Sequence, residues 1–107
     1  LSQANLIGAN VQNAILSRAN LTQAIVTAAN MNRANLSGAD FSGAKLTGTD
    51  LGEADLRGAN FREADMEGAV LAGAQFDDTT QWPDDFDPVE HGAERVETDD
   101  FVEILPE

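Results

Sequence analysis

Apolar residues recur along most of this chain with a strict period of five residues. Alanine occupies every fifth position from Ala4 to Ala74, with Thr49 as the one exception, and a larger apolar residue follows each of these positions two places later. The other three positions of each pentad are mostly polar. This period fits neither an amphipathic helix, whose apolar face recurs about every 3.6 residues, nor a half-buried strand, whose period is about 2.

Each pentad is therefore predicted to form a short extended stretch followed by a turn. The alanine and the larger apolar residue would face inward, and the other three residues would face outward. One pentad cannot bury its inward residues alone, so successive turns of a solenoid must stack on one another. Thr49 is expected to be tolerated at an alanine position, because its hydroxyl can bond a nearby carbonyl.

Several pentads match a known family. Residues 34–38 (Ala-Asn-Leu-Ser-Gly), 39–43 (Ala-Asp-Phe-Ser-Gly) and 54–58 (Ala-Asp-Leu-Arg-Gly) closely resemble the pentapeptide-repeat proteins, whose repeat is Ala-(Asp/Asn)-Leu-X-X. The resemblance covers residues 1 to about 78. It implies an all-β fold, a right-handed quadrilateral β-helix of about four coils with four pentads in each coil, followed by a C-terminal capping segment.

A four-sided coil predicts that residues 20 positions apart stack on one another. One predicted column contains Leu1, Leu21, Phe41 and Phe61, which places two phenylalanine rings in contact. Each buried Leu or Phe should contribute about 1.5–3 kcal/mol. The residues predicted to form the centre of the structural core are Leu21, Leu36, Phe41, Leu51, Leu56 and Phe61.

The repeat stops near residue 78, which divides the chain into a β-helix (1–78), a cap (79–92) and an acidic tail (93–107). The last coil of a β-helix exposes apolar surface, and Trp82 and Phe86 are the predicted cap residues. Residues 79–88 resemble the T-x-W-P-x-x-F-D-P ending of many cyanobacterial members of the family. Asp87 as N-cap, Pro88 as first helical residue and Glu90 in a capping box predict one short helical turn that Gly92 ends.

The tail has three possible arrangements. Its apolar residues either fold back on the β-helix as an irregular strand, remain partly disordered among the acidic residues, or dock on a partner protein. These residues are Phe101, Val102, Ile104 and Leu105.

Charge is distributed unevenly over the 107 residues, whose formal net charge is −13. Residues 1–76 hold seven acidic and five basic residues, whereas residues 77–107 hold twelve acidic and one basic residue. No apolar run is long enough to span a membrane, and basic residues are too scattered to predict nucleic-acid binding. The compartment is not determined: it is cytoplasmic, or periplasmic or thylakoid-lumenal if a leader precedes Leu1.

The sequence predicts no catalytic residues, no cofactor and no metal site. His91 is the only histidine and is expected to be a surface residue. The acidic residues Asp84, Asp85, Asp87 and Glu90 lack the spacing of an EF-hand calcium loop, and they are expected to be a solvated acidic surface.

Two outward-facing isoleucines, Ile7 and Ile25, lie in adjacent predicted coils and form a possible interaction patch. Scattered apolar residues are also normal on protein surfaces, and a preceding segment could cover these two. The sequence therefore predicts a non-catalytic structural or protein-interaction module, monomeric or weakly dimeric, with an unknown protein partner. The alternatives are an acidic DNA-mimicking inhibitor of a type II topoisomerase, as some family members are, and a regulatory domain of a larger protein.

Overall fold

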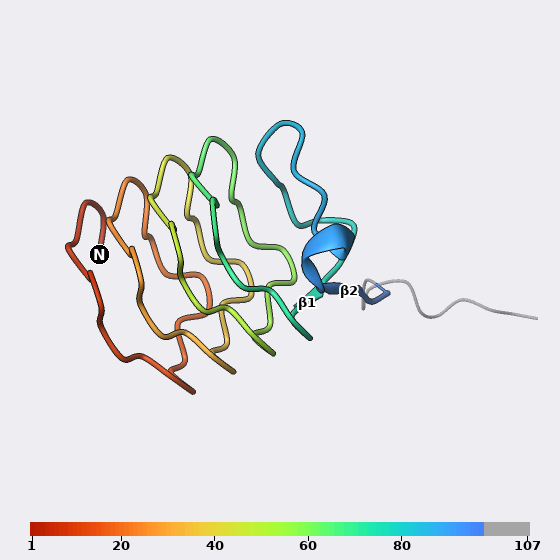
Figure 1. Cartoon of the computed structure of the whole chain (residues 1–107), viewed down its shortest axis with the longest axis horizontal. Helices are drawn as coiled ribbons and strands as arrows, with labels where there is room; N and C mark the ends of the chain where they lie inside the picture. Colours follow the sequence, from red (N-terminus) through yellow and green to blue (C-terminus); the bar gives the residue numbers. More distant parts are fainter. Residues whose placement is uncertain (98–107) are drawn as a thin grey trace, which may run out of the picture.

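Parallel β-bridges between residues 20 positions apart hold the fold together. They run from the pair Asn5 and Ile25 to the pair Asp55 and Gln75. One coil therefore takes 20 residues, or four pentads, and Figure 1 shows the coils stacked along one axis. This computed structural model describes residues 1–97. Phe101, Val102, Ile104 and Leu105 of the predicted tail lie outside the described residues.

Most of the pairing consists of isolated bridges because each pentad provides only one bridge residue before its turn. In a typical pentad, the N–H of Leu46 donates to Asp65 O at 2.8 Å, and the N–H of Asp65 donates back to Ala44 O at 2.9 Å. Within residues 1–97, only β1 (Gln75–Phe76) and β2 (Glu94–Arg95) form a longer pairing. They are parallel, with Gln75 opposite Glu94, so β2 at the start of the predicted tail lies on the last coil.

Asn and Asp side chains shape the turns of the coils. In most pentads the residue before the large apolar residue is Asn or Asp, and its Oδ1 accepts a hydrogen bond from the N–H two residues later. The Ile7 N–H lies 3.1 Å from Asn5 Oδ1, and the Ser37 N–H lies 3.1 Å from Asn35 Oδ1. Any polar residue would suit an exposed position, but only Asn and Asp readily form this Asx turn. The turn therefore explains why these two residue types recur there.

The inward-facing residues of the coils from residue 21 onward form one core. The side chains of Leu21, Leu36, Phe41, Leu51, Leu56 and Phe61 are completely buried. The rings of Phe41 and Phe61 stack with centroids 5.1 Å apart, as a 20-residue column predicts. The prediction for Thr49 is confirmed, because its hydroxyl donates to Val26 O at 2.6 Å.

The coil of residues 1–20 is less buried than those that follow it. Leu6, Val11 and Leu16 are half-buried, and Leu1, which belongs to the predicted Phe41 column, is 59% exposed. No described residue lies over this end of the stack (Figure 1), so the inward side chains are covered on one side only.

The predicted helical turn is a 3-10 helix, η1, at Val89–His91. The assignment of Asp87 as N-cap was wrong by one residue, because Pro88 occupies that position. The His91 N–H donates to Pro88 O at 3.0 Å, which is the first hydrogen bond of the 3-10 turn. The residue that accepts this first bond is the N-cap, so the N-cap is Pro88. Asp87 Oδ1 still accepts from the Val89 N–H, but the capping box with Glu90 does not form. Gly92, with a φ of 94°, ends the turn as expected.

Candidate interaction surfaces

Ile7 and Ile25 lie on the same wall of the stack, in adjacent coils. Ile25 forms a bridge with Asn5, and its carbonyl accepts the Leu6 N–H at 2.7 Å, so Ile7 follows directly after this contact. Ile7 is 58% exposed and Ile25 is 38% exposed. Ile15 is 79% exposed, but it lies two pentads further along the coil, on the opposite wall.

An aromatic stack continues the core column beyond the last coil. Trp82 lies on Phe61 with ring centroids 5.0 Å apart, Phe86 lies on Trp82 at 5.4 Å, and His91 lies on Phe86 at 4.5 Å. Stacked aromatic pairs each add about 0.5–1.5 kcal/mol beyond the area that they bury. Trp82 and Phe86, the residues predicted to cap the stack, are both half-buried and lie on this column together with the ring of His91.

Residues 77–80 form the hinge between the last coil and the cap. They hold one residue more than the repeat allows, since Asn60 forms its bridge with Gln81, 21 positions away. The Thr79 hydroxyl donates to Asp77 Oδ1 at 2.6 Å, and the Thr80 hydroxyl donates to Leu56 O at 2.9 Å. Thr80 takes an alanine position and makes the same kind of bond as Thr49, so the core column continues across the insertion.

The carboxylate of Asp77 is held ionised by this hinge. Burial acts to raise its pKa, but hydrogen bonds from Thr79, from the Gly58 N–H and from Thr80 outweigh burial, and the pKa lies below its usual value. Asp55 behaves alike: burial acts to raise its pKa, and its hydrogen bonds and ion pair with Arg57 lower it overall. Both carboxylates therefore stay charged near neutral pH.

Sequence reasoning did not single out Asp77 and Thr80, nor the stacking of His91 on Phe86. A signal for the hinge exists, because the large apolar residue after Phe76 comes six positions later, at Trp82, instead of five. No signal of this kind exists for His91. Its position depends on η1 and on the bond between His91 Nδ1 and Asp87 O, 2.9 Å apart.

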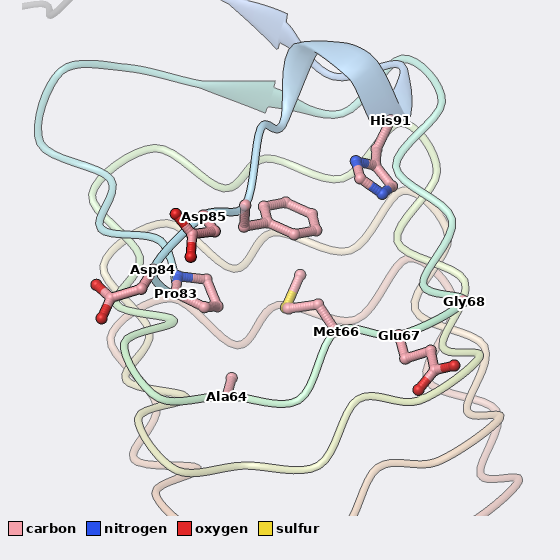
Figure 2. Close-up of a pocket in the computed structure, with 9 residues that line it drawn as sticks. Ala64, Met66, Glu67, Gly68, Pro83, Asp84, Asp85 and His91 are labelled. Atoms are coloured by element: carbon pink, nitrogen blue, oxygen red, sulfur yellow. The ribbon is translucent and has the colours of Figure 1, made fainter.

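A pocket of about 290 Å³ lies between the last coil and the cap. Figure 2 shows Ala64 on its floor, Met66 pointing toward the cap segment, Pro83 and Asp85 on one side and His91 on the other. The remaining lining residues are Glu67, Gly68, Asp84 and Phe86. Apolar side chains thus form the interior of the pocket, and carboxylates lie around it.

The acidic residues of the cap do not converge on one point. Asp87 accepts the Val89 N–H, while Asp84, Asp85 and Glu90 are exposed. In the part of the chain that the structure describes, no group of three or more His, Cys, Asp or Glu residues could hold a metal ion. Over the same residues, no helix is long and apolar enough to cross a membrane.

Comparison with protein-family models matches most of the chain. A model of pentapeptide repeats matches residues 1–38 and 14–52, and a second model of pentapeptide repeats matches residues 41–82. A comparison with curated protein sequences gave no match.

Solved structures of pentapeptide repeat proteins resemble this one. A protein from the cyanobacterium Cyanothece 51142 is 36% identical, with a TM-score of 0.76 over 77% of this chain and 56% of its own. A protein from the Arabidopsis thaliana thylakoid lumen is 37% identical, with a TM-score of 0.62 over 77% of this chain and 60% of its own. A third, from Nostoc PCC 7120, is 36% identical, with a TM-score of 0.50 over 89% of this chain and 83% of its own.

The matched region thus spans little more than half the length of the first and second of these proteins. The repeat models, the residue pattern and the coil geometry agree over residues 1–82. The chain belongs to the pentapeptide repeat proteins.

Proposed function

We propose that this chain is a non-catalytic protein-interaction module. In this proposal residues 1–78 form a right-handed quadrilateral β-helix of about four coils, residues 79–92 cap it, and an unknown protein binds one wall. The observation that carries the proposal is the exposure of Ile7 and Ile25 in adjacent coils on that wall. Burying such side chains against a partner yields roughly 25 cal/mol per Å² of apolar area.

Hydrogen bonds between adjacent coils hold the wall beneath the two isoleucines. The Leu6 N–H donates to Ile25 O, and the Ile25 N–H donates to Ala4 O at 2.9 Å. A preorganised backbone loses little freedom when a partner docks. Outward side chains can also change without disturbing the core: the bridge column that contains Ile25 also contains Asn5, Lys45 and Asp65.

The perturbed carboxylates favour a structural role over catalysis. A general acid or base works best with a pKa near the operating pH. Asp55 and Asp77 are shifted in the opposite direction, since hydrogen bonds and, for Asp55, the Arg57 ion pair keep their pKa values low. In both side chains, Oδ1 also accepts a hydrogen bond from the N–H two residues later in its own turn.

The charge distribution disfavours the topoisomerase inhibitor. A DNA mimic needs a long acidic wall, whereas residues 1–76 are nearly balanced in charge and the acidity lies after them. A regulatory domain of a larger protein would use the same wall on a second domain of its own polypeptide.

The test compares capture of partner proteins by the full chain and by two variants. The patch variant, Ile7→Glu with Ile25→Lys, introduces residues already present in the same columns at Glu67 and Lys45. The control variant, Ile15→Lys, adds a charge on the opposite wall. Each immobilised protein is incubated with extract of the source organism, and bound proteins are quantified by mass spectrometry.

We expect at least one protein to be retained by the native chain and the control, and to be depleted at least tenfold by the patch variant. Equal capture by all three would contradict the proposal. A supercoiling assay with a purified type II topoisomerase should show no inhibition, and concentration-dependent inhibition would support the DNA mimic instead.

A further inference from the structure

The last coil leaves a row of backbone groups without hydrogen-bond partners among residues 1–97. In the preceding coil, the N–H groups of Leu46 and Gly48 donate to Asp65 O and Glu67 O. One coil later, the corresponding N–H groups have no acceptor among residues 1–97. We call this row the open edge; it consists of the N–H groups of Glu63, Met66, Gly68 and Leu71 and the carbonyls of Ala64 and Ala69.

The cap closes two sides of this coil and leaves the other two open. On the closed sides, the Phe61 N–H donates to Gln81 O at 2.8 Å, and the Gly73 N–H donates to Gly92 O at 2.9 Å. Between these points the cap covers the core with the aromatic rings and the pyrrolidine of Pro83 instead of with backbone. Unpaired N–H and C=O groups along a strand edge can pair with another chain.

The pocket of about 290 Å³ lies directly on the open edge. Ala64, Met66 and Gly68 line it from the last coil, and Pro83 lines it from the cap (Figure 2). A second pocket of about 320 Å³ adjoins it at Pro83 and is lined by Glu63, the next residue of the edge. The edge therefore faces accessible space with an apolar interior.

Carboxylates surround this space. Glu67, Asp84 and Asp85 line the first pocket, whose lining includes His91 but no Lys or Arg, and Glu63 and Asp84 line the second with Arg62. No ion pair within the described residues neutralises these four acids. Arg62 instead donates to Gln81 Oε1 at 3.4 Å.

We propose that the open edge is a docking site for a short, extended, cationic peptide segment of another protein. Its backbone would donate to Ala64 O and accept from the N–H groups of Met66 and Gly68, as an added coil would. An apolar side chain would pack on Met66, and flanking Lys or Arg side chains would meet Asp84 and Glu67. Strand addition to an exposed edge is a common mode of peptide recognition.

Charge decides between the possible occupants. Residues 98–107 of this chain hold four acidic residues and no basic ones, and the cap of a second copy is acidic too. Either would bring like charges together, which costs affinity and specificity. A cationic segment gains from the same carboxylates. The site extends the proposed function to a second surface, on the cap side of the stack.

The experiment titrates the ¹⁵N-labelled full chain with a blocked seven-residue peptide of alternating Lys and Val. We expect saturable binding, chemical-shift changes centred on Met66 and Gly68, and at least tenfold slower hydrogen exchange of these amides in the complex. The same peptide with Glu in place of Lys should not bind. A Lys-Val peptide with N-methylated backbone amides should bind at least tenfold more weakly, because it cannot donate to Ala64 O.

Matched variants locate the site. Asp84→Lys should weaken binding of the Lys-Val peptide at least tenfold, whereas Glu97→Lys, which changes net charge equally away from the pocket, should have less than a twofold effect. The Ile7→Glu, Ile25→Lys variant should bind the peptide like the native chain, so failure here is distinguishable from failure of the wall patch. Protection of Met66 and Gly68 in the free protein, shifts centred elsewhere, or equal weakening by both Lys variants would overturn the proposal.

Discussion

The coils of residues 21–60 and the last coil, residues 61–76, have the same sequence pattern but different neighbours. In the former, hydrogen bonds to adjacent coils continue along all four sides, and the inward side chains are almost entirely buried. In the latter, the cap continues these bonds on two sides only, and Ala64 and Met66 remain 8% and 5% exposed.

A further coil would both cover the core and hydrogen-bond the backbone of the last coil. The rings of the aromatic stack lie over the core column, with Trp82 against Phe61. They cannot hydrogen-bond the peptide groups around it. A cap built from side chains therefore covers the core but leaves part of the backbone available for hydrogen bonds. The proposed peptide site is this part of the backbone, the open edge.

The largest effect is expected from a charge within the fully enclosed coils. Leu51→Asp removes a completely buried side chain, at a cost of about 2–5 kcal/mol, and buries a carboxylate that has no partner. The sum approaches the roughly 5–15 kcal/mol that stabilises a typical domain. We expect no cooperative unfolding transition by circular dichroism. Gln12→Asp, on an exposed outward position, should unfold cooperatively like the native chain; a cooperative Leu51→Asp variant would contradict the enclosure of this coil.

A smaller effect is expected at the hinge, where the two kinds of coil meet. Asp77→Asn keeps an oxygen acceptor but loses the charge that strengthens the bonds from the Thr79 N–H and hydroxyl, at a cost of about 1–2 kcal/mol near pH 7. Because the folded pKa is lowered, this contribution is complete above the unfolded value of about 3.8 and disappears as pH falls through the folded pKa.

Urea unfolding at several pH values measures this contribution. The stability difference between native and Asp77→Asn chains should narrow steadily from about pH 5 downward. Asp78→Asn is the control, since the Asp78–Arg95 ion pair is exposed and worth no more than about 1 kcal/mol. A difference that is constant between pH 3 and 7 would show that the charge of Asp77 has no role.

The repeat predicted a stacked solenoid, and the resemblance to pentapeptide-repeat proteins implied its coil of four pentads, whereas the cap depends on contacts that no period describes. Because every pentad repeats the same inward pair, a 20-residue coil places Phe41 on Phe61 without further information. The Asx turns were missed because polarity alone seemed to explain outward Asn and Asp. The open edge could not be predicted, since it depends on the path of residues 82–91, where Pro83 and the ring contacts replace the ladder.

The smallest effect concerns the turns that all coils share. The second residue after each large apolar residue from Leu1 to Leu71 has a left-handed backbone, with φ of 68° at Gly48 and 59° at Ala28, its equivalent one coil earlier. This conformation costs a residue with a Cβ roughly 1 kcal/mol. Ala28→Gly should therefore raise the free energy of unfolding by about 0.5–1 kcal/mol, measured from the urea midpoint. Gly48→Ala should lower it similarly, because no atom lies within 4 Å of the added Cβ and only backbone strain changes. Ala29→Gly, at a buried position in the same turn region, should destabilise instead. If Ala28→Gly were also destabilising, the conformational cost of the turn would not be what selects glycine in these repeats.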